Sequence, residues 1–231
     1  MQKRPGKLIV IEGTDGSGKA TQASLLKSAL AQKNYPVESI EFPRYKESFH
    51  GKTIERYLKG EFGEVAKVSP YLVSLAYSLD RVTAKREMNA WLRAGKIVLA
   101  NRYATSNMAY SGANIPDPEK DKFLHWLLEL EYKVNKIPKE DLVIYLHVPV
   151  AVAKVLIKGR GRKSDIHEEN FEYLTKTEKM YDLLSKRFKH WVKVSCVGNN
   201  GVMRSKDSIN KEIVGILKKH KIVMFDSIDY T

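Results

Sequence analysis

With 231 residues and a single cysteine, Cys196, the chain suits one domain over residues 1–231, without an intrachain disulfide, in a reducing cytoplasm. No apolar run approaches the roughly 20 residues that span a bilayer, so the protein is not expected to cross a membrane. The formal net charge of +13 comes from basic residues spread along the chain, so charge alone does not indicate a nucleic-acid partner.

Short apolar segments alternate with amphipathic segments along the chain. Strands are predicted at residues 7–12, 37–42, 97–100, 142–148 and 191–197. Helices are predicted at residues 22–32, 71–93, 121–133, 150–158, 167–188 and 207–220. Short apolar strands separated by helices indicate a parallel sheet that is buried on both faces. We therefore predict an α/β protein with three layers, in which helices flank a five-stranded parallel sheet; residues 222–231 stay unassigned.

Residues 13–19, GTDGSGK, match the G-x-x-x-x-G-K pattern of a P-loop and lie between a predicted strand and a predicted helix. The glycines let successive N–H groups face a phosphate, and the helix N-terminus adds its positive dipole end. A plain glycine-rich turn would explain the glycines but not Lys19, which is expected to reach the β- and γ-phosphates. The predicted ATP-binding residues of this P-loop NTPase fold are Gly13, Thr14, Asp15, Gly16, Ser17, Gly18, Lys19, Ala20 and Thr21.

Position 20 departs from the P-loop pattern, which has a Ser or Thr there to ligate Mg²⁺. This chain has Ala20, and Thr21 is turned about 100° further around the helix, so Thr21 is not assumed to replace the missing ligand. We predict that Mg²⁺ is a cofactor that arrives with ATP and is held mainly by phosphates and water. Asp15 is the acidic loop residue that can contact a coordinated water, although it also suits a turn-stabilising role.

Further segments follow in a definite order: FPRY at 42–45, YSLDR at 77–81, NRY at 101–103, SNMAY at 106–110 and KGRGRK at 158–163. Together with IEGTDGSGKATQ at 11–22 they resemble the thymidylate kinases, P-loop nucleoside monophosphate kinases, over residues 7–184. The resemblance implies an enzyme that phosphorylates dTMP to dTDP with ATP, by in-line phosphoryl transfer, in thymidine nucleotide synthesis. It also implies a homodimer with ATP and dTMP as its ligands, and a short mobile lid at about residues 158–166.

The resemblance also assigns residues to dTMP. Tyr77 corresponds to the aromatic residue that stacks on thymine, and Arg81, one helical turn later, corresponds to the arginine that donates to the O4 atom of the base. Asn107 corresponds to a reader of the base N3 atom, and Tyr110 to the residue that crowds the 2′ position of the sugar. The predicted dTMP-binding residues are Asp15, Phe42, Arg44, Tyr77, Arg81, Arg102, Asn107 and Tyr110. On the residues alone, Phe42 equally suits the core, and Tyr77 with Arg81 equally suits an ordinary helix surface.

Arg102 and Arg44 suit clamps on the acceptor phosphate, because a planar guanidinium matches phosphate oxygens. Asp15 corresponds to a position that contacts the sugar 3′-hydroxyl or a metal-bound water. In the lid, Arg160 and Arg162 are alternatives for the arginine that stabilises the transition state. The predicted catalytic residues are Lys19, Arg102, Asp15, Arg160 and Arg162.

Position 101 is a second departure, since the family usually has Asp where this chain has Asn101. An amide can orient a metal-bound water but brings no negative charge. A phosphate monoester is mostly dianionic at neutral pH, so the reaction needs no histidine base, and the six histidines are assigned to surface or packing roles. Two alternatives stay open: a kinase for another nucleoside monophosphate or deoxynucleoside, and a P-loop ATPase that binds nucleic acid.

Overall fold

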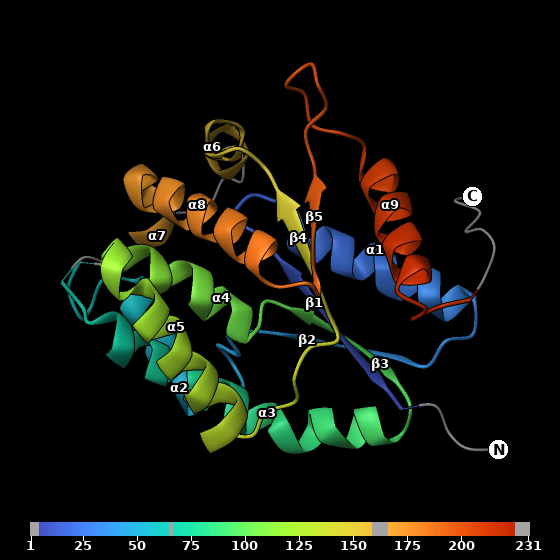
Figure 1. The fold of residues 1–231 in the computed structure, drawn as a ribbon, viewed down its shortest axis with the longest axis horizontal. Coiled ribbons are helices and arrows are strands. Elements are labelled where there is room, and N and C mark those ends of the chain that lie inside the picture. The colour runs from blue at the N-terminus through green and yellow to red at the C-terminus, as the bar shows by residue number, and fades with distance from the viewer. Residues whose placement is uncertain (1–4, 65–66, 159–165, 225–231) are drawn as a thin grey trace.

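The computed structural model describes residues 5–64, 67–158 and 166–224, and a central sheet separates two groups of helices (Figure 1). The strands are β1 (Lys7–Glu12), β2 (Val37–Glu41), β3 (Ile97–Asn101), β4 (Leu142–His147) and β5 (Trp191–Ser195). They are all parallel, in the order β2-β3-β1-β4-β5. The prediction of a five-stranded parallel sheet flanked by helices is therefore confirmed.

Helices cover both faces of the sheet. They are α1 (Lys19–Gln32), α2 (Phe49–Leu58), α3 (Pro70–Arg93), α4 (Ala104–Tyr110), α5 (Lys120–Leu128), α6 (Val150–Lys158), α7 (Ile166–Glu169), α8 (Phe171–Arg187) and α9 (Lys206–Lys219). Short 3₁₀ turns lie at Gly112–Asn114 and Asp117–Glu119, and a π-helical segment, Glu129–Val134, continues α5.

Successive residues of each strand enter different cores, as the twofold period of a strand requires. Leu8 and Val10 of β1 pack with side chains of α3, α4, α5 and α8. Ile9 and Ile11 pack on the other face with α1 and α9. Both faces of the central strands β1, β3 and β4 are thus covered, which explains their nearly continuous apolar sequences. The edge strands β2 and β5 carry exposed polar residues.

Two helices were not predicted from the sequence. α2 contains Gly51, which is unfavourable inside a helix, but the Ser48 hydroxyl accepts a hydrogen bond from Gly51 N at 2.7 Å and caps the helix start. The segment ATSNMAY of α4 has no apolar stripe, and almost all its residues are buried. Tertiary packing, rather than local pattern, therefore makes α4 helical.

The prediction of one continuous helix over residues 167–188 was wrong, because the helix is interrupted at Asn170. The chain leaves the helix at Asn170, whose Oδ1 accepts from Tyr173 N at 3.0 Å and caps α8. The helix predicted over residues 121–133 changes to π-helical geometry from Glu129 onwards. This change carries Glu131 into the interior, where it is fully buried.

Three of the nucleotide-related motifs follow strands at one edge of the sheet. The P-loop follows β1, the FPRY segment begins directly after β2, and Arg102 follows β3. This carboxyl edge is where open parallel sheets place their ligands. Among the described helices, none is long and apolar enough to cross a membrane.

Candidate functional site

The predicted P-loop forms a backbone cradle between β1 and α1. Gly13 has a φ of 149°, and a Cβ there would lie 2.5 Å from Ser17 Oγ and 2.6 Å from a carbonyl oxygen of β4, so the loop closes only around glycine. Gly18 is the N-cap of α1 with a φ of 85°, and its lack of a side chain leaves the first N–H groups of the helix to a ligand. Lys19 Nζ donates to the carbonyls of Gly13 and Thr14 at 3.0 Å and 2.9 Å.

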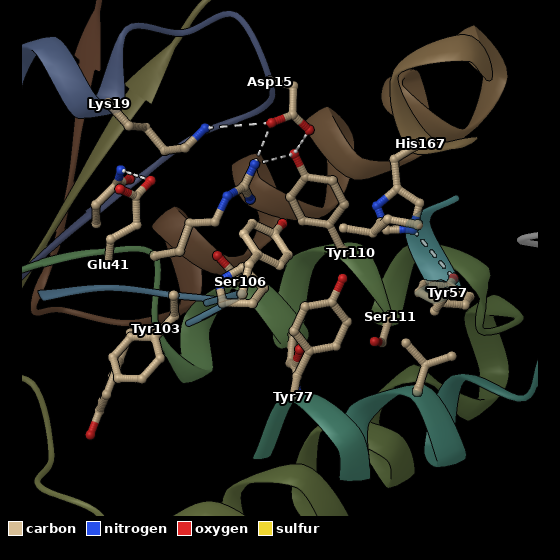
Figure 2. A pocket seen from close by; sticks show the side chains of 18 of the residues that line it. Asp15, Lys19, Glu41, Tyr57, Tyr77, Tyr103, Ser106, Tyr110, Ser111 and His167 are labelled. Atoms are coloured by element: carbon tan, nitrogen blue, oxygen red, sulfur yellow. Dashed lines mark hydrogen bonds and ion pairs between the residues drawn. The ribbon is translucent and has the colours of Figure 1, made fainter. Parts of the chain in front are cut away.

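Three predicted side chains join the P-loop to the end of β3 and to α4. Arg102 Nη2 donates to Asp15 Oδ1 at 2.5 Å and to Tyr110 Oη at 3.2 Å, while Tyr110 Oη donates to Asp15 Oδ2 at 2.8 Å (Figure 2). The Arg102 guanidinium also lies 4.8 Å from the centre of the Tyr110 ring. Arg102 has a φ of 64°, a left-handed backbone conformation that is uncommon outside glycine and clusters at functional sites.

Charges fix the protonation states in this network. Burial alone would raise the pKa of Asp15, but Arg102 and then Lys19 outweigh burial, so this pKa lies well below its usual range. Burial raises the pKa of Tyr110 well above its ordinary value, although Arg102 opposes that shift. Asp15 is therefore an anion, and both of its oxygens are already engaged by Arg102 and by the protonated Tyr110 hydroxyl.

A cavity of about 300 Å³ opens beside this network, within the size range of small-molecule sites. The predicted residues that the structure places in its wall are Asp15, Gly18, Lys19, Ala20, Thr21, Phe42, Tyr77, Arg81, Arg102, Asn107 and Tyr110. Among the described residues, the wall does not include Gly13, Thr14, Gly16 or Ser17, which form the back of the P-loop. The two lid arginines, Arg160 and Arg162, lie outside the described residues.

Arg81, Tyr77 and Asn107 line the cavity from α3 and α4. Asn107 Nδ2 donates to Ser74 O at 3.2 Å, which orients its amide. Arg81 is only 2% exposed; its Nη2 and Nε donate to the fully buried Glu131, and its Nη1 donates to a carbonyl of the β3–α4 connection at 3.4 Å. Arg81 is thus a buried, neutralised cation rather than an exposed helix arginine.

Arg44 is held away from the cavity. Its Nε donates to Glu47 at 2.9 Å and its Nη1 donates to Thr83 Oγ1 at 3.3 Å, and it is not among the described residues of the cavity wall. Its role as a phosphate clamp stays a prediction that this arrangement does not support. Phe42 is 2% exposed, and its ring lies 5.8 Å from that of Tyr103, so it belongs to the core as well as to the wall.

His167, Tyr57 and Tyr173 form an aromatic wall that the sequence did not reveal. The His167 ring stacks on Tyr110 at 5.5 Å, lies 4.9 Å from the Tyr173 ring, and has its Nε2 3.3 Å from Tyr57 Oη. Burial lowers the pKa of His167 to about 4, with Arg102 adding to the shift and Asp15 opposing it. These rings come from α2, α4, α7 and α8, so no local motif could have marked them.

The oxygen atoms around the P-loop decide how a divalent cation fits. Within the described ranges, no cluster of three or more His, Cys, Asp or Glu residues is placed to hold a metal. Ala20 lines the cavity without an oxygen, and both oxygens of Asp15 are engaged. Asn101 Oδ1, in contrast, is buried and has no hydrogen-bond partner. The wall would therefore hold a hydrated, oxygen-preferring cation such as Mg²⁺ through bound water rather than through a preformed set of side-chain ligands.

Comparison with known proteins decides between the P-loop families. A family model described as thymidylate kinase matches residues 11–227. The chain belongs to the thymidylate kinase family. Similar family members include the thymidylate kinase of Mycobacterium tuberculosis (strain H37Rv), 32% identical over 179 residues, which are 75% of this chain and 83% of that one.

Other family members have similar sequence identity to this chain. The thymidylate kinase of Plasmodium falciparum (isolate 3D7) is 30% identical over 220 residues, covering 95% of this chain and 93% of its own. A solved structure of thymidylate kinase from Candida albicans superposes with a TM-score of 0.76 at 23% identity, covering 97% of both chains. At that identity the superposition shows the shared fold of the thymidylate kinase family.

We expect stability to depend on pH through His167. The unfolded histidine titrates near 6.5 and the folded one near 4, so the unfolded state binds more protons in this window, and stability falls as the pH falls through it. The full loss is on the order of 3 kcal/mol, at about 1.4 kcal/mol per pKa unit. Urea unfolding at a series of pH values should show that His167→Gln loses less stability than the unsubstituted protein. Equal losses would contradict the assignment.

Proposed function

We propose that this thymidylate kinase family member transfers the γ-phosphoryl group of ATP to dTMP, giving ADP and dTDP. The observation that carries the proposal is that Lys19 of the P-loop and Arg102, which directly follows β3, line the same cavity, with Asp15 between them. A donor phosphate on the P-loop and an acceptor phosphate at Arg102 would then face each other across that cavity.

Positioning and charge neutralisation supply most of the rate in such a reaction, because the dianionic acceptor needs little help from a base. On the donor side, the P-loop amides and Lys19 bind the phosphates of ATP. Mg²⁺ bound with ATP would supply further charge neutralisation at the phosphate oxygens. On the acceptor side, the ion pair with Asp15 pre-orients Arg102, and burial strengthens its attraction for a phosphate.

The nucleoside of dTMP is proposed to lie along α3 and α4. Tyr77 offers a ring for stacking, and Asn107 offers an amide for the base edge. Tyr110 is held rigidly by Arg102, Asp15 and the stacked His167, so its ring can crowd the 2′ position of a sugar. A rigid tyrosine would exclude a 2′-hydroxyl sterically, which supports a preference for deoxyribose.

A nucleotide panel tests the function. With ATP and Mg²⁺, ADP release should be strongest with dTMP among dTMP, dUMP, dCMP, dAMP, dGMP and thymidine. Lys19→Ala should lower this turnover about 100-fold or more, because it removes the positive charge that contacts the β- and γ-phosphates. Lys27→Ala is the matched control, since Lys27 lies on the same helix and bonds Ser39 outside the cavity, at 3.0 Å. Salt-sensitive oligonucleotide binding without dTMP-dependent turnover would instead indicate a nucleic-acid-binding ATPase.

The role of Arg81 needs a double substitution. Arg81→Ala alone should destabilise the fold by about 3 kcal/mol or more, because it leaves Glu131 charged and buried without its partner. Arg81→Met with Glu131→Leu removes the whole ion pair and should recover most of that stability. If Arg81 reads the base, the double variant should still raise the KM for dTMP without changing the KM for ATP. Recovery of both stability and dTMP affinity would show that Arg81 is structural.

We also propose that the chain forms a homodimer through α2 and α3. Phe49 of α2 is 79% exposed, and Leu72 and Leu79 of α3 are 64% and 42% exposed. Leu72 and Leu79 lie seven residues apart on one face of α3. Light scattering at micromolar concentration should give a dimer mass, and Leu72→Glu with Leu79→Glu should give a monomer. Val202→Glu, at an exposed residue outside these helices, is the control. A monomer mass for the unsubstituted chain would refute the dimer.

A cytoplasmic location of the protein stays a prediction.

A further inference from the structure

Glu41 and Asn101 form a side-chain pair at the carboxyl edge of the sheet. They are the last residues of β2 and β3 and lie directly opposite each other in the strand register. Asn101 Nδ2 donates to Glu41 Oε1 at 2.7 Å, and both residues line the cavity (Figure 2). Glu41 was not among the residues predicted from the sequence.

The carboxylate fixes which way the Asn101 amide points. Only the NH₂ group can donate to an anion, so Nδ2 faces Glu41 and Oδ1 faces the other way. Asn101 is 7% exposed, and its Oδ1 is buried with no hydrogen-bond partner. An acceptor left unsatisfied in a protein interior calls for an explanation, and a bound water or ion is among the common ones.

Glu41 also differs from the other charged groups of the cavity. Asp15 is paired with Arg102, and Arg81 is paired with Glu131. In the part of the chain that the structure describes, the Glu41 carboxylate has the amide of Asn101 as its partner and forms no ion pair. Glu41 is exposed at the edge of the cavity, so its carboxylate is solvated and accessible to a cation.

Mg²⁺ in phosphate-transferring enzymes is bound by one or two carboxylates together with substrate phosphates and water. Ala20 offers no oxygen, and Asp15 has both oxygens engaged by Arg102 and Tyr110. Glu41 is then the carboxylate of the cavity wall that is still open to a cation.

We propose that Glu41 is the protein's carboxylate ligand, direct or through water, for the Mg²⁺ that accompanies ATP. Asn101 is a positioning residue: its Nδ2 holds the Glu41 carboxylate, and its Oδ1 accepts a hydrogen bond from a metal-bound water. The carboxylate that the family usually carries at position 101 is thereby replaced by one from the neighbouring strand. The inference rests on the proposed use of ATP by this site.

Binding of Mn²⁺, which prefers the same oxygen ligands as Mg²⁺, tests the proposal without turnover. Electron paramagnetic resonance measures free Mn²⁺ during titration of the protein with a non-hydrolysable ATP analogue bound. Glu41→Gln should raise the Mn²⁺ Kd of this complex by about tenfold. Glu38→Gln is the matched control, because Glu38 lies on the same strand, is paired with Lys96 at 2.6 Å and should leave the Kd unchanged.

Exchanging the pair separates a metal role from a structural one. Glu41→Gln with Asn101→Asp keeps one carboxylate and one amide in contact, so it should recover most of the Mn²⁺ affinity that Glu41→Gln loses. If Glu41→Gln lowers the unfolding midpoint but leaves the Mn²⁺ Kd unchanged, the pair only ties β2 to β3 and the proposal is overturned. An exchanged pair that binds as weakly as Glu41→Gln also overturns it.

The outcome is independent of the acceptor. Turnover with dTMP in the unsubstituted protein tests the proposed function, whereas the Mn²⁺ titration contains no acceptor nucleotide. A protein that loses Mn²⁺ affinity in Glu41→Gln but phosphorylates no dTMP would support the metal site and refute the dTMP kinase activity. If the protein phosphorylates dTMP but Glu41→Gln leaves its Mn²⁺ affinity unchanged, the dTMP kinase activity is supported and the metal site is refuted.

Discussion

The ion pair between Asp15 and Arg102 is the contact on which the geometry of the cavity depends. It ties the P-loop, which follows β1, to the residue that follows β3, and β1 and β3 are neighbours in the sheet. Tyr110 closes the arrangement by bonding both partners. Because the three groups bond one another in a partly buried cluster, each limits the motion of the others, and the donor and acceptor sides of the site share one rigid unit. Arg102 accepts an uncommon left-handed backbone conformation to join it.

Charge compensation organises the rest of the wall. A chain with a net charge of +13 still buries Arg81 against Glu131 and pairs the partly buried Arg102 with Asp15, since a buried charge without a partner is costly. Glu41 needs no charged partner because it is exposed to water, and it accepts a hydrogen bond from the neutral amide of Asn101. The cavity thus combines settled ion pairs with one carboxylate whose charge is left for a ligand. That distribution suits a site that must take up polyphosphates together with a cation.

Aromatic rings give the cavity its shape. Tyr110 contacts His167 and Tyr173, and Tyr57 bonds His167, so four rings from four helices support one another. Burial keeps His167 neutral at physiological pH, which lets it pack against Tyr110 without bringing a second positive charge close to Arg102. α7, which carries His167, directly follows the segment where the lid is predicted. α7 is therefore linked to the cavity wall through a packed ring rather than through a charge.

The sequence by itself determined the sheet, the P-loop and the order of the motifs. Strands buried on both faces must be apolar, and a phosphate cradle needs glycines and a lysine at set spacings. Both features therefore produce a pattern that can be recognised in the local sequence. It did not determine α4, the break at Asn170, or the partners of Arg81 and Asn101. Those depend on Glu131 and Glu41, which lie far away in the chain and belong to no motif. Only the tertiary structure decided them, because ion pairs and aromatic contacts form between whichever side chains the packed helices and adjacent strands bring together.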